Sequence, residues 1–255
     1  MRYELRPMSF GDILDGAFKL YRDHFVTFLA IAAIPTILVQ LLTGLLFPDF
    51  VGQPKPQVDV GRAMGFAGTM MIVGSVLYWI ETAALTVVVA DVYLGRPSGF
   101  SSAYRRAWRV LGKLIAASLV WTLAVMGGLM LLIIPGVLLM FRWLLYAQVL
   151  VVEEVDVGDS LRRSRDLTRG LKGKLFLLML VVGLVSIAIT LGAQALAQPL
   201  ARQIPVLGAL IQGVPQILFA PLSSAVMTLA YFDARIRKEG FDLQVLAREV
   251  LGGKE

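Results

Sequence analysis

The sequence predicts an all-α membrane protein: a polytopic bundle of six transmembrane helices with amphipathic helices at its cytoplasmic surface. Of its 255 residues, 57% are hydrophobic and only 16% are charged, whereas a soluble domain is about half apolar and about a quarter charged. Uncharged runs long enough to cross a bilayer recur along the chain. Nearly all Lys and Arg residues fall in every second gap between these runs, as in a chain threaded back and forth through a membrane.

A polar, proline-rich stretch separates the first two predicted spans. The run from Phe25 to Phe47 carries no charge and exceeds the about 20 apolar residues that cross a bilayer. A long apolar helix follows over 63–93, interrupted only by Glu81 and Asp91. Because the chain before residue 25 is charged and amphipathic, we expect the first span to stay as an anchor and not to be a signal peptide.

Residues 114–152 form one apolar run with a single charge, Arg142. The run is too long for one span, so it predicts two short spans joined by a tight turn at Ile134-Pro135-Gly136. Gly127, Gly128 and Gly136 have two interpretations. We favour close helix packing over a discontinuous element that lines a cavity.

The last two spans are predicted over 175–201 and 203–232, where Pro205, Pro215 and Pro221 indicate a lead-in segment or a kink. Six spans place both termini on one side of the membrane. The chain is then one integral membrane domain, with a cytoplasmic amphipathic helix over 1–24, the bundle over 25–238 and a cytoplasmic tail over 239–255.

The distribution of positive charge predicts which side the termini occupy. Of the 24 Lys and Arg residues, only Lys55, Arg62 and Arg202 fall in the opposite loops, and Arg142 falls within a span. Because positively charged loops stay in the cytoplasm, both termini are predicted to be cytoplasmic, in a bacterial-type inner membrane. The net charge of +6 is therefore explained by the membrane topology of the chain, and we do not expect nucleic acid as a partner.

The residue types argue against chemistry within the membrane. The chain has no cysteine and one histidine, His24, which excludes disulfides, thiolate nucleophiles and histidine-rich zinc sites. The apolar runs contain neither paired carboxylates nor a Ser-His arrangement. We therefore expect no enzyme activity, no metal and no cofactor.

An amphipathic stripe precedes each predicted pair of spans. Apolar residues recur at helical spacing from Phe10, from Phe100 and from Val157, where Arg165 interrupts the stripe. Capping candidates lie near each start: Ser9 or Asp12, Ser101 or Ser102, and Asp159. The shared register favours a three-unit repeat of interfacial helix plus helical hairpin. The alternative is that any loop between spans tends to be basic and amphipathic.

Glu81 and Arg142 are the two charged residues whose positions are least explained by the predicted path of the chain through the membrane. A carboxylate deep in an apolar helix is costly unless paired, and it is by default a functional candidate. An ion pair between Glu81 and Arg142 would neutralise both charges. The alternative is that Arg142 extends to the outer interface while Glu81 is protonated or faces a water-filled crevice. Further polar lining, or interhelical hydrogen bonding, is expected from Gln148, Gln194, Gln198 and Gln212.

The basic clusters hold candidate contacts for anionic lipid head groups, because each basic residue near an anionic leaflet contributes about 1 kcal/mol. The candidates are Arg105, Arg106, Arg109, Arg162, Arg163, Arg165 and Arg169. A nearby acidic run comprises Glu153, Glu154, Asp156 and Asp159. This run lacks the ligand pattern of an EF-hand, so we expect it to face the neighbouring arginines.

Several polar junctions carry a resemblance to a known family. They are Leu5-Arg6-Pro7-Met8-Ser9-Phe10-Gly11-Asp12-Ile13-Leu14-Asp15, Tyr93-Leu94-Gly95-Arg96-Pro97 leading to Ala103-Tyr104-Arg105-Arg106-Ala107, Ile134-Pro135-Gly136 followed by Arg142-Trp143, Ser160-Leu161-Arg162-Arg163-Ser164 and, most specific, Tyr231-Phe232-Asp233-Ala234-Arg235-Ile236-Arg237-Lys238-Glu239-Gly240-Phe241-Asp242-Leu243. With these junctions the chain resembles the membrane domain of the glycerophosphoryl diester phosphodiesterase family. The resemblance implies a six-helix inner-membrane module. The catalytic barrel of fused members needs about 250 residues, for which this chain has no room, so no catalytic residue is carried over.

The sequence thus predicts a non-catalytic inner-membrane scaffold or regulatory partner module that interacts with anionic lipid. Other membrane proteins, or a second copy of the chain, are the further partners we expect. The alternative is a lipid or small-solute transporter with a cavity near Glu81 and Arg142.

The threading can be tested by labelling. Single cysteines placed at Gln57 and at Gly158 of this cysteine-free chain should react with a membrane-impermeant maleimide from opposite faces of oriented vesicles, because six spans put these positions on different sides. Labelling of both cysteines from the same face would contradict the six-span threading.

Overall fold

The computed structural model describes residues 6–51, 59–201 and 203–241, which form helices and no strand. The elements in chain order are α1 (Phe10–Asp23), α2 (Phe25–Leu46), the 3-10 turn η1 (Pro48–Phe50), α3 (Val60–Thr69), the π-helical turn η2 (Met70–Gly74), α4 (Ser75–Tyr93), α5 (Phe100–Leu131), α6 (Ile133–Arg142), α7 (Tyr146–Glu153), α8 (Val157–Thr168), α9 (Lys172–Ala201) and α10 (Pro205–Glu239). The predicted all-α fold class is confirmed.

Within the described residues, six helical stretches are long and apolar enough to cross a membrane: Phe25–Leu46, Val60–Tyr93, Phe100–Leu131, Ile133–Glu153, Lys172–Ala201 and Pro205–Glu239. By the length and composition of these helices the chain is a multi-pass membrane protein. Most of the predicted C-terminal tail, from residue 242 onward, lies outside the described residues.

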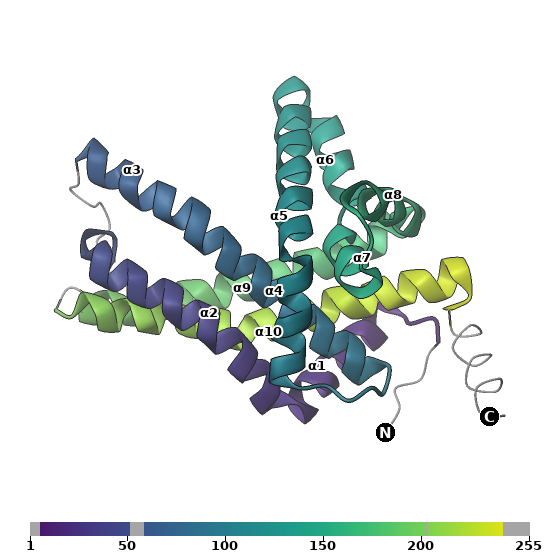
Figure 1. The fold of residues 1–255 in the computed structure, drawn as a ribbon, viewed down its shortest axis with the longest axis horizontal. Helices are drawn as coiled ribbons and strands as arrows, with labels where there is room; N and C mark the ends of the chain where they lie inside the picture. Colours follow the sequence, from purple (N-terminus) through teal and green to yellow (C-terminus); the bar gives the residue numbers. More distant parts are fainter. Residues whose placement is uncertain (1–5, 52–58, 202, 242–255) are drawn as a thin grey trace.

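The long helix α10 is the centre of the packing. It contacts α2 and α9 most extensively, and it also packs against α1 and α4. Figure 1 shows α2, α9 and α10 along the long axis of the molecule, while α5 and α6 run across them. Tyr231 and Phe232 of α10 are among the largest fully buried side chains. The core therefore sits where the C-terminal part of α10 meets its neighbours.

The hairpin of α5 and α6 turns earlier than predicted. The chain reverses at Leu132, which has an extended backbone (φ −159°, ψ 139°), and not at Ile134-Pro135-Gly136. Pro135 lies in the first turn of α6, where a missing N–H costs little. Gly128 and Gly136 face each other, since a Cβ on Gly128 would lie 2.9 Å from the Gly136 Cα. These two glycines allow close helix packing, which is the interpretation we favoured.

Of the two alternatives for the last span, a lead-in segment or a kink, the structure does not show a separate lead-in segment. One helix runs from Pro205 at its first position through Pro215 and Pro221 to Glu239. Gly213 lies against α2, where a Cβ would come within 2.7 Å of the Gln40 side chain. The close approach that this glycine permits brings the proline-containing part of α10 against the polar side chains of α2.

Helices begin at Phe10, Phe100 and Val157, where the three stripes predicted them. Each buries small or apolar residues against the bundle, for example Ala17 in α1 and Ala107 in α5. The three units are not identical, because the second stripe continues into its span as the single helix α5. The first and third stripes are separate helices that end before α2 and α9.

The first of the three capping predictions is confirmed, and at the second helix start Gly99 and not Ser101 or Ser102 holds the cap position. Ser9 and Asp12 form a reciprocal capping box at the start of α1. Hydrogen bonding to the Ser9 backbone N–H, and to a smaller extent to the Ser9 hydroxyl, lowers the pKa of the Asp12 carboxyl group. The capping box therefore stabilises α1 fully at pH values above the ordinary carboxyl pKa. This stabilisation is lost as the pH falls through the lowered pKa of Asp12. Ser102 bonds to Gly99 at the second start. At the third start, Asp156 and not Asp159 holds the cap position, and its side chain makes no capping hydrogen bond.

A proline in α2 leaves a backbone carbonyl that another helix satisfies. Pro35 lies inside α2 and has no N–H to donate to the carbonyl of Ile31 one turn earlier. The Tyr104 hydroxyl of α5 donates to that carbonyl oxygen at 2.7 Å. An orphaned backbone group is costly in an apolar medium, so this bond fixes the second amphipathic stripe against α2.

We therefore predict that Tyr104→Phe lowers the free energy of unfolding by about 1 to 3 kcal/mol, because it leaves the Ile31 carbonyl without a donor. The measurement is denaturant unfolding in a defined detergent. Tyr21→Phe is the matched control, since no hydrogen bond from the Tyr21 hydroxyl to a described residue is seen. Equal stability of the Tyr104 variant and the parent would contradict this role.

Candidate functional site

One end of the bundle carries a cluster of charges around Asp233, which is only 1% exposed. Its carboxylate accepts hydrogen bonds from the Met8 N–H at 2.8 Å, from Lys174 Nζ at 2.6 Å and from Arg237 Nε at 2.9 Å. Lys174 and Arg237 also donate to the Met8 carbonyl oxygen, each at 2.6 Å. This Asp233 cluster ties the segment before α1 to α9 and α10.

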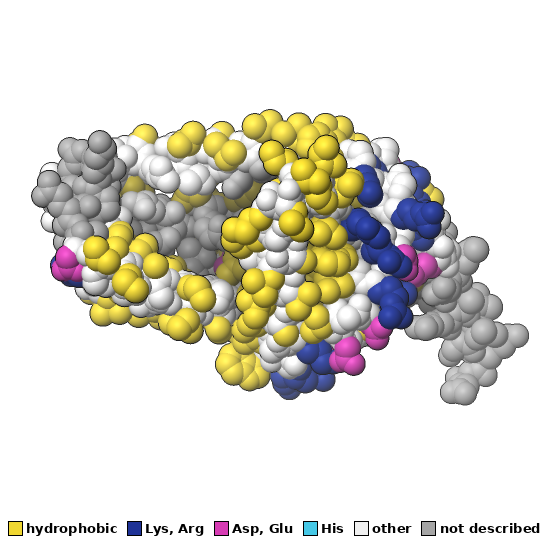
Figure 2. Space-filling model, turned by 90° about the horizontal axis from the view of Figure 1, so that it is seen from above, with side chains coloured by type: hydrophobic (Ala, Val, Ile, Leu, Met, Phe, Trp, Pro, Cys, Tyr) yellow, Lys and Arg dark blue, Asp and Glu magenta, His cyan; other side chains and the backbone are white. Residues whose placement is uncertain are grey.

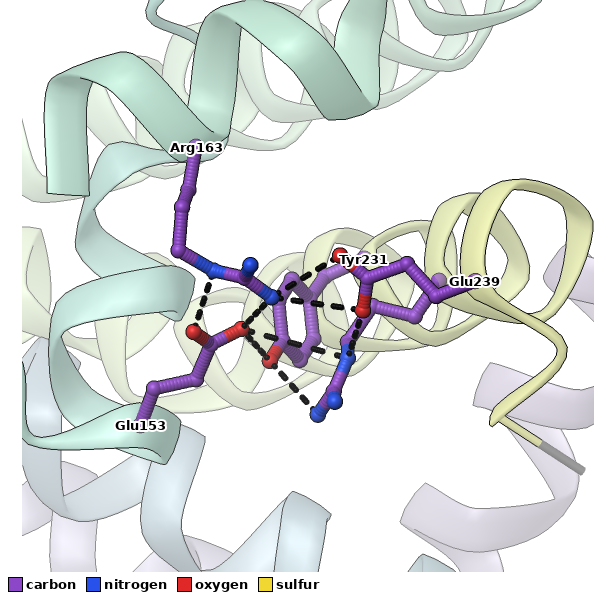
Figure 3. Close-up of polar contacts among 5 residues, drawn as sticks. Glu153, Arg163, Tyr231 and Glu239 are labelled. Carbon is purple, nitrogen blue, oxygen red and sulfur yellow. Dashed lines mark hydrogen bonds and ion pairs between the residues drawn. The ribbon is translucent and has the colours of Figure 1, made fainter. Parts of the chain in front are cut away.

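A second cluster joins α7 and α8 to the C-terminal end of α10 (Figure 3). Arg163 contacts Glu153 and donates to Glu239 at 2.9 Å. The Tyr231 hydroxyl donates to Glu153 at 2.8 Å, and Arg235 Nε lies 3.0 Å from a Glu239 oxygen. The two carboxylates and two guanidinium groups neutralise one another, so the cluster is a structural contact between helices.

The prediction that the acidic run faces arginines is confirmed for Glu153, Glu154 and Asp159, whereas Asp156 pairs with a lysine. Besides Glu153, Glu154 lies 3.6 Å from Arg106, Asp159 lies 4.0 Å from Arg162, and Asp156 lies 2.6 Å from Lys113. The hydrogen bond from Lys113 lowers the pKa of Asp156. In the described part of the chain, no group of three or more His, Cys, Asp or Glu residues is arranged to hold a metal ion.

These ion pairs divide the candidate lipid contacts into two groups. Arg106 pairs with Asp91 at 3.0 Å and also with Glu154, and Arg163 belongs to the cluster of Figure 3, so both charges are neutralised internally. The remaining candidates are exposed. They are Arg105, Arg109, Arg162, Arg165 and Arg169.

The exposed basic residues of α8 surround two adjoining hollows, together the basic hollow, with volumes of about 410 and 310 Å³. Their cationic lining is Arg142, Arg162, Arg165, Arg169 and Lys172. Leu138 and Leu139 of α6 form an apolar wall, and Asp166 is the only carboxylate among the lining residues. Figure 2 shows Lys and Arg side chains gathered along one edge of the hydrophobic surface. The basic hollow thus combines positive charge with an apolar flank.

Arg142 does not pair with Glu81, so the structure does not support the ion pair considered above. Arg142 is exposed at the end of α6 and lines the basic hollow, whereas Glu81 is 4% exposed and lines a different pocket. The reason is the helix break after Arg142, whose carbonyl accepts hydrogen bonds from the hydroxyls of Ser164 at 3.3 Å and Thr168 at 3.1 Å. This break places Arg142 beside α8.

Glu81 lines a pocket of about 260 Å³ between α2, α4 and α10, here called the Glu81 pocket. Its polar lining is Thr36, Gln40, Tyr78, Glu81 and Gln216. The glutamines that the sequence analysis singled out do not line it. One signal was available in the sequence, because Thr36 and Gln40 lie one helical turn apart beside Pro35 and therefore share a face.

A hollow of about 830 Å³ lies beside α1 and includes the half-buried His24. Its charged lining is mixed: Arg6, Lys19 and Arg96 with Asp12, Asp15 and Asp23. Because these charges offset one another, this hollow has less attraction for an anion than the basic hollow. We therefore take the basic hollow and the Glu81 pocket as the candidate functional sites.

Comparison of the chain with protein-family models, with curated proteins and with solved structures finds no match. The resemblance to the membrane domain of the glycerophosphoryl diester phosphodiesterase family therefore stays a prediction from the polar junctions.

The Asp233 cluster should be essential for stability. We predict that Asp233→Asn lowers the free energy of unfolding by about 3 kcal/mol or more, because it removes the buried carboxylate that Lys174 and Arg237 share. Thermal unfolding in nanodiscs measures the loss. Asp156→Asn removes a carboxylate that is 78% exposed, so the loss of its solvated ion pair with Lys113 should change little, and Asn is also accepted at the cap position. A loss for Asp233→Asn no larger than that of this control would show that the cluster is not stabilising.

Proposed function

We propose that the protein is a non-catalytic scaffold or regulatory partner module of an inner membrane, which binds anionic lipid at the basic hollow. Both termini lie on the cytoplasmic side in this proposal, and the further partners are other membrane proteins or a second copy of the chain. The observation that carries it is the convergence of five cationic side chains on one hollow with a leucine flank.

The charges of the basic hollow favour an anionic head group. Elsewhere at this end of the bundle, buried or half-buried cations such as Lys174 and Arg106 have carboxylate partners. In the hollow, Asp166 is the only lining carboxylate and lies 3.3 Å from Arg165, which leaves an excess of positive charge. A phosphate accepts hydrogen bonds from several guanidinium groups at once.

The apolar flank favours a lipid over a free phosphate. Leu138 and the neighbouring α6 residues Ile133 and Ile134 are 46%, 73% and 74% exposed. Exposed apolar side chains of this density are typical of a surface that contacts acyl chains. A lipid could place its head group in the basic hollow and its chains along α6.

The proposed orientation is supported by the arrangement of the helix ends. The Asp233 cluster joins the segment before α1 to the C-terminal part of α10, so both described ends of the chain lie at the same end of the bundle. The basic residues of α5 and α8 belong to the loops that the positive-inside rule keeps in the cytoplasm.

A lipid or small-solute transporter is the second candidate, and the Glu81 pocket is the observation in its favour. Arg142 does not take part in this pocket. A transport site would therefore rest on Glu81 and its uncharged neighbours alone.

The lipid proposal is tested by native mass spectrometry of the detergent-solubilised protein. The parent should retain phosphatidylglycerol in preference to phosphatidylcholine. The double variant Arg165→Gln/Arg169→Gln should bind phosphatidylglycerol roughly 30-fold more weakly, because two basic residues near an anionic lipid contribute about 2 kcal/mol.

The matched control is Arg22→Gln/Arg96→Gln, which removes the same charge from exposed positions outside the basic hollow. It should leave phosphatidylglycerol binding within about twofold of the parent. Equal losses in both double variants would attribute binding to net charge and refute a site at the hollow. Equal retention of both lipids by the parent would refute the preference for anionic lipid.

A further inference from the structure

The Glu81 pocket contains two buried oxygen atoms that no described residue satisfies. Glu81 is 4% exposed and Thr36 is 5% exposed, and neither Glu81 Oε1 nor Thr36 Oγ1 has a partner in good hydrogen-bond geometry, although Thr36 and Gln216 lie close enough to the Glu81 carboxyl group to interact with it. A buried polar group without a partner costs free energy, and buried polar groups in folded proteins are nearly always paired. Both side chains line the same pocket, so a ligand in it could pair with both.

Each helix that forms the Glu81 pocket contributes lining residues from one of its faces. In α4, Tyr78 and Glu81 share a face with Gly74, since these positions recur at helical spacing. Gly74 ends the π-helical turn η2, and such turns are frequent at functional sites. In α2, Thr36 and Gln40 point to the same side, and Gln216 comes from α10 next to Pro215.

No lysine, arginine or histidine lines the Glu81 pocket, and Glu81 forms no ion pair with any residue in the described ranges. The protein therefore supplies a carboxylate, a hydroxyl, a phenol and two amides, but no cation. Such a set offers several hydrogen-bond acceptors to a positively charged donor. An anionic ligand would meet the Glu81 carboxylate without any compensating charge.

We propose that the Glu81 pocket binds a small primary ammonium ligand, whose N–H groups donate to Glu81 and Thr36. The ammonium group carries three donors, which suit two unpaired oxygens and an amide oxygen. The short apolar part of the ligand lies against Pro35, Val39 and Leu77. A volume of about 260 Å³ is below the range of drug-sized pockets, about 300 to 1,000 Å³, and limits the ligand to a few non-hydrogen atoms.

The pocket reaches the surface of the bundle. Tyr78 lines it and is 51% exposed within the membrane-spanning stretch Val60–Tyr93, so a ligand would enter beside Tyr78 from the side of the bundle that faces the bilayer. The inference does not depend on lipid binding at the basic hollow, because the two sites share no lining residue.

The experiment uses the whole protein in nanodiscs and three probes: n-butylammonium, butan-1-ol and sodium. We expect n-butylammonium to raise Tm in a concentration-dependent manner, while butan-1-ol and sodium have no comparable effect. Glu81→Gln keeps the shape of the side chain and removes its charge, so it should weaken n-butylammonium binding at least about tenfold. Asp159→Asn, an exposed carboxylate of α8, is the control and should bind as the parent does.

A second variant keeps the test decisive if Glu81→Gln does not fold. Thr36→Val is close in shape and removes one of the two unpaired oxygens, so it should weaken n-butylammonium binding severalfold. An equal effect of butan-1-ol would show an apolar hole without charge recognition and overturn the proposal. An equal effect of sodium would assign the pocket to a metal cation, and undiminished binding by Glu81→Gln or Thr36→Val would place the ammonium elsewhere.

Discussion

The interaction on which the rest of the structure depends is the burial of the Asp233 carboxylate between an amide, an ammonium and a guanidinium group. An isolated carboxylate would be costly in so buried a position. Because its partners come from the segment before α1, from α9 and from α10, satisfying this one charge also brings these three parts of the chain together. The cluster around Glu153 does the same for α7, α8 and the end of α10. The apolar spans supply the bulk of the bundle, and these ion pairs fix how its charged end is arranged.

Backbone groups impose a similar requirement where helices are interrupted. Pro35 leaves the Ile31 carbonyl without its donor, and Tyr104 supplies one from α5. The break after α6 leaves the Arg142 carbonyl and the Leu145 N–H without partners in a helix. The Ser164 hydroxyl accepts a hydrogen bond from the Leu145 N–H and donates one to the Arg142 carbonyl. This explains why the third amphipathic stripe buries serine where the first buries alanine. Small polar side chains on the surface helices thus complete the hydrogen bonding of the spans.

Local signals in the sequence predicted the helices, whereas the composition of the candidate sites depends on packing between helices that are distant in the sequence. The helix starts at Phe10 and Phe100 could be predicted because periodicity and capping are local. The turn at Leu132 was displaced because Pro135 is tolerated inside the first turn of a helix. The proposed pairing of Glu81 with Arg142 was wrong because it assumed a continuous span through Arg142, whereas the helix breaks there. The Glu81 pocket draws its lining from α2, α4 and α10, and no spacing within one helix predicts which polar residues of separate helices meet.

At the charged end of the bundle, acidic and basic side chains pair with one another. Glu81 has no cationic partner among the described residues of the protein, and Arg142 belongs to the basic hollow. A double-mutant cycle of Glu81→Gln and Arg142→Gln, measured by unfolding in nanodiscs, tests this most directly. If the two side chains lie in separate sites, their effects on the free energy of unfolding add to within about 0.5 kcal/mol. A coupling energy well above about 1 kcal/mol would show that they interact and contradict the account.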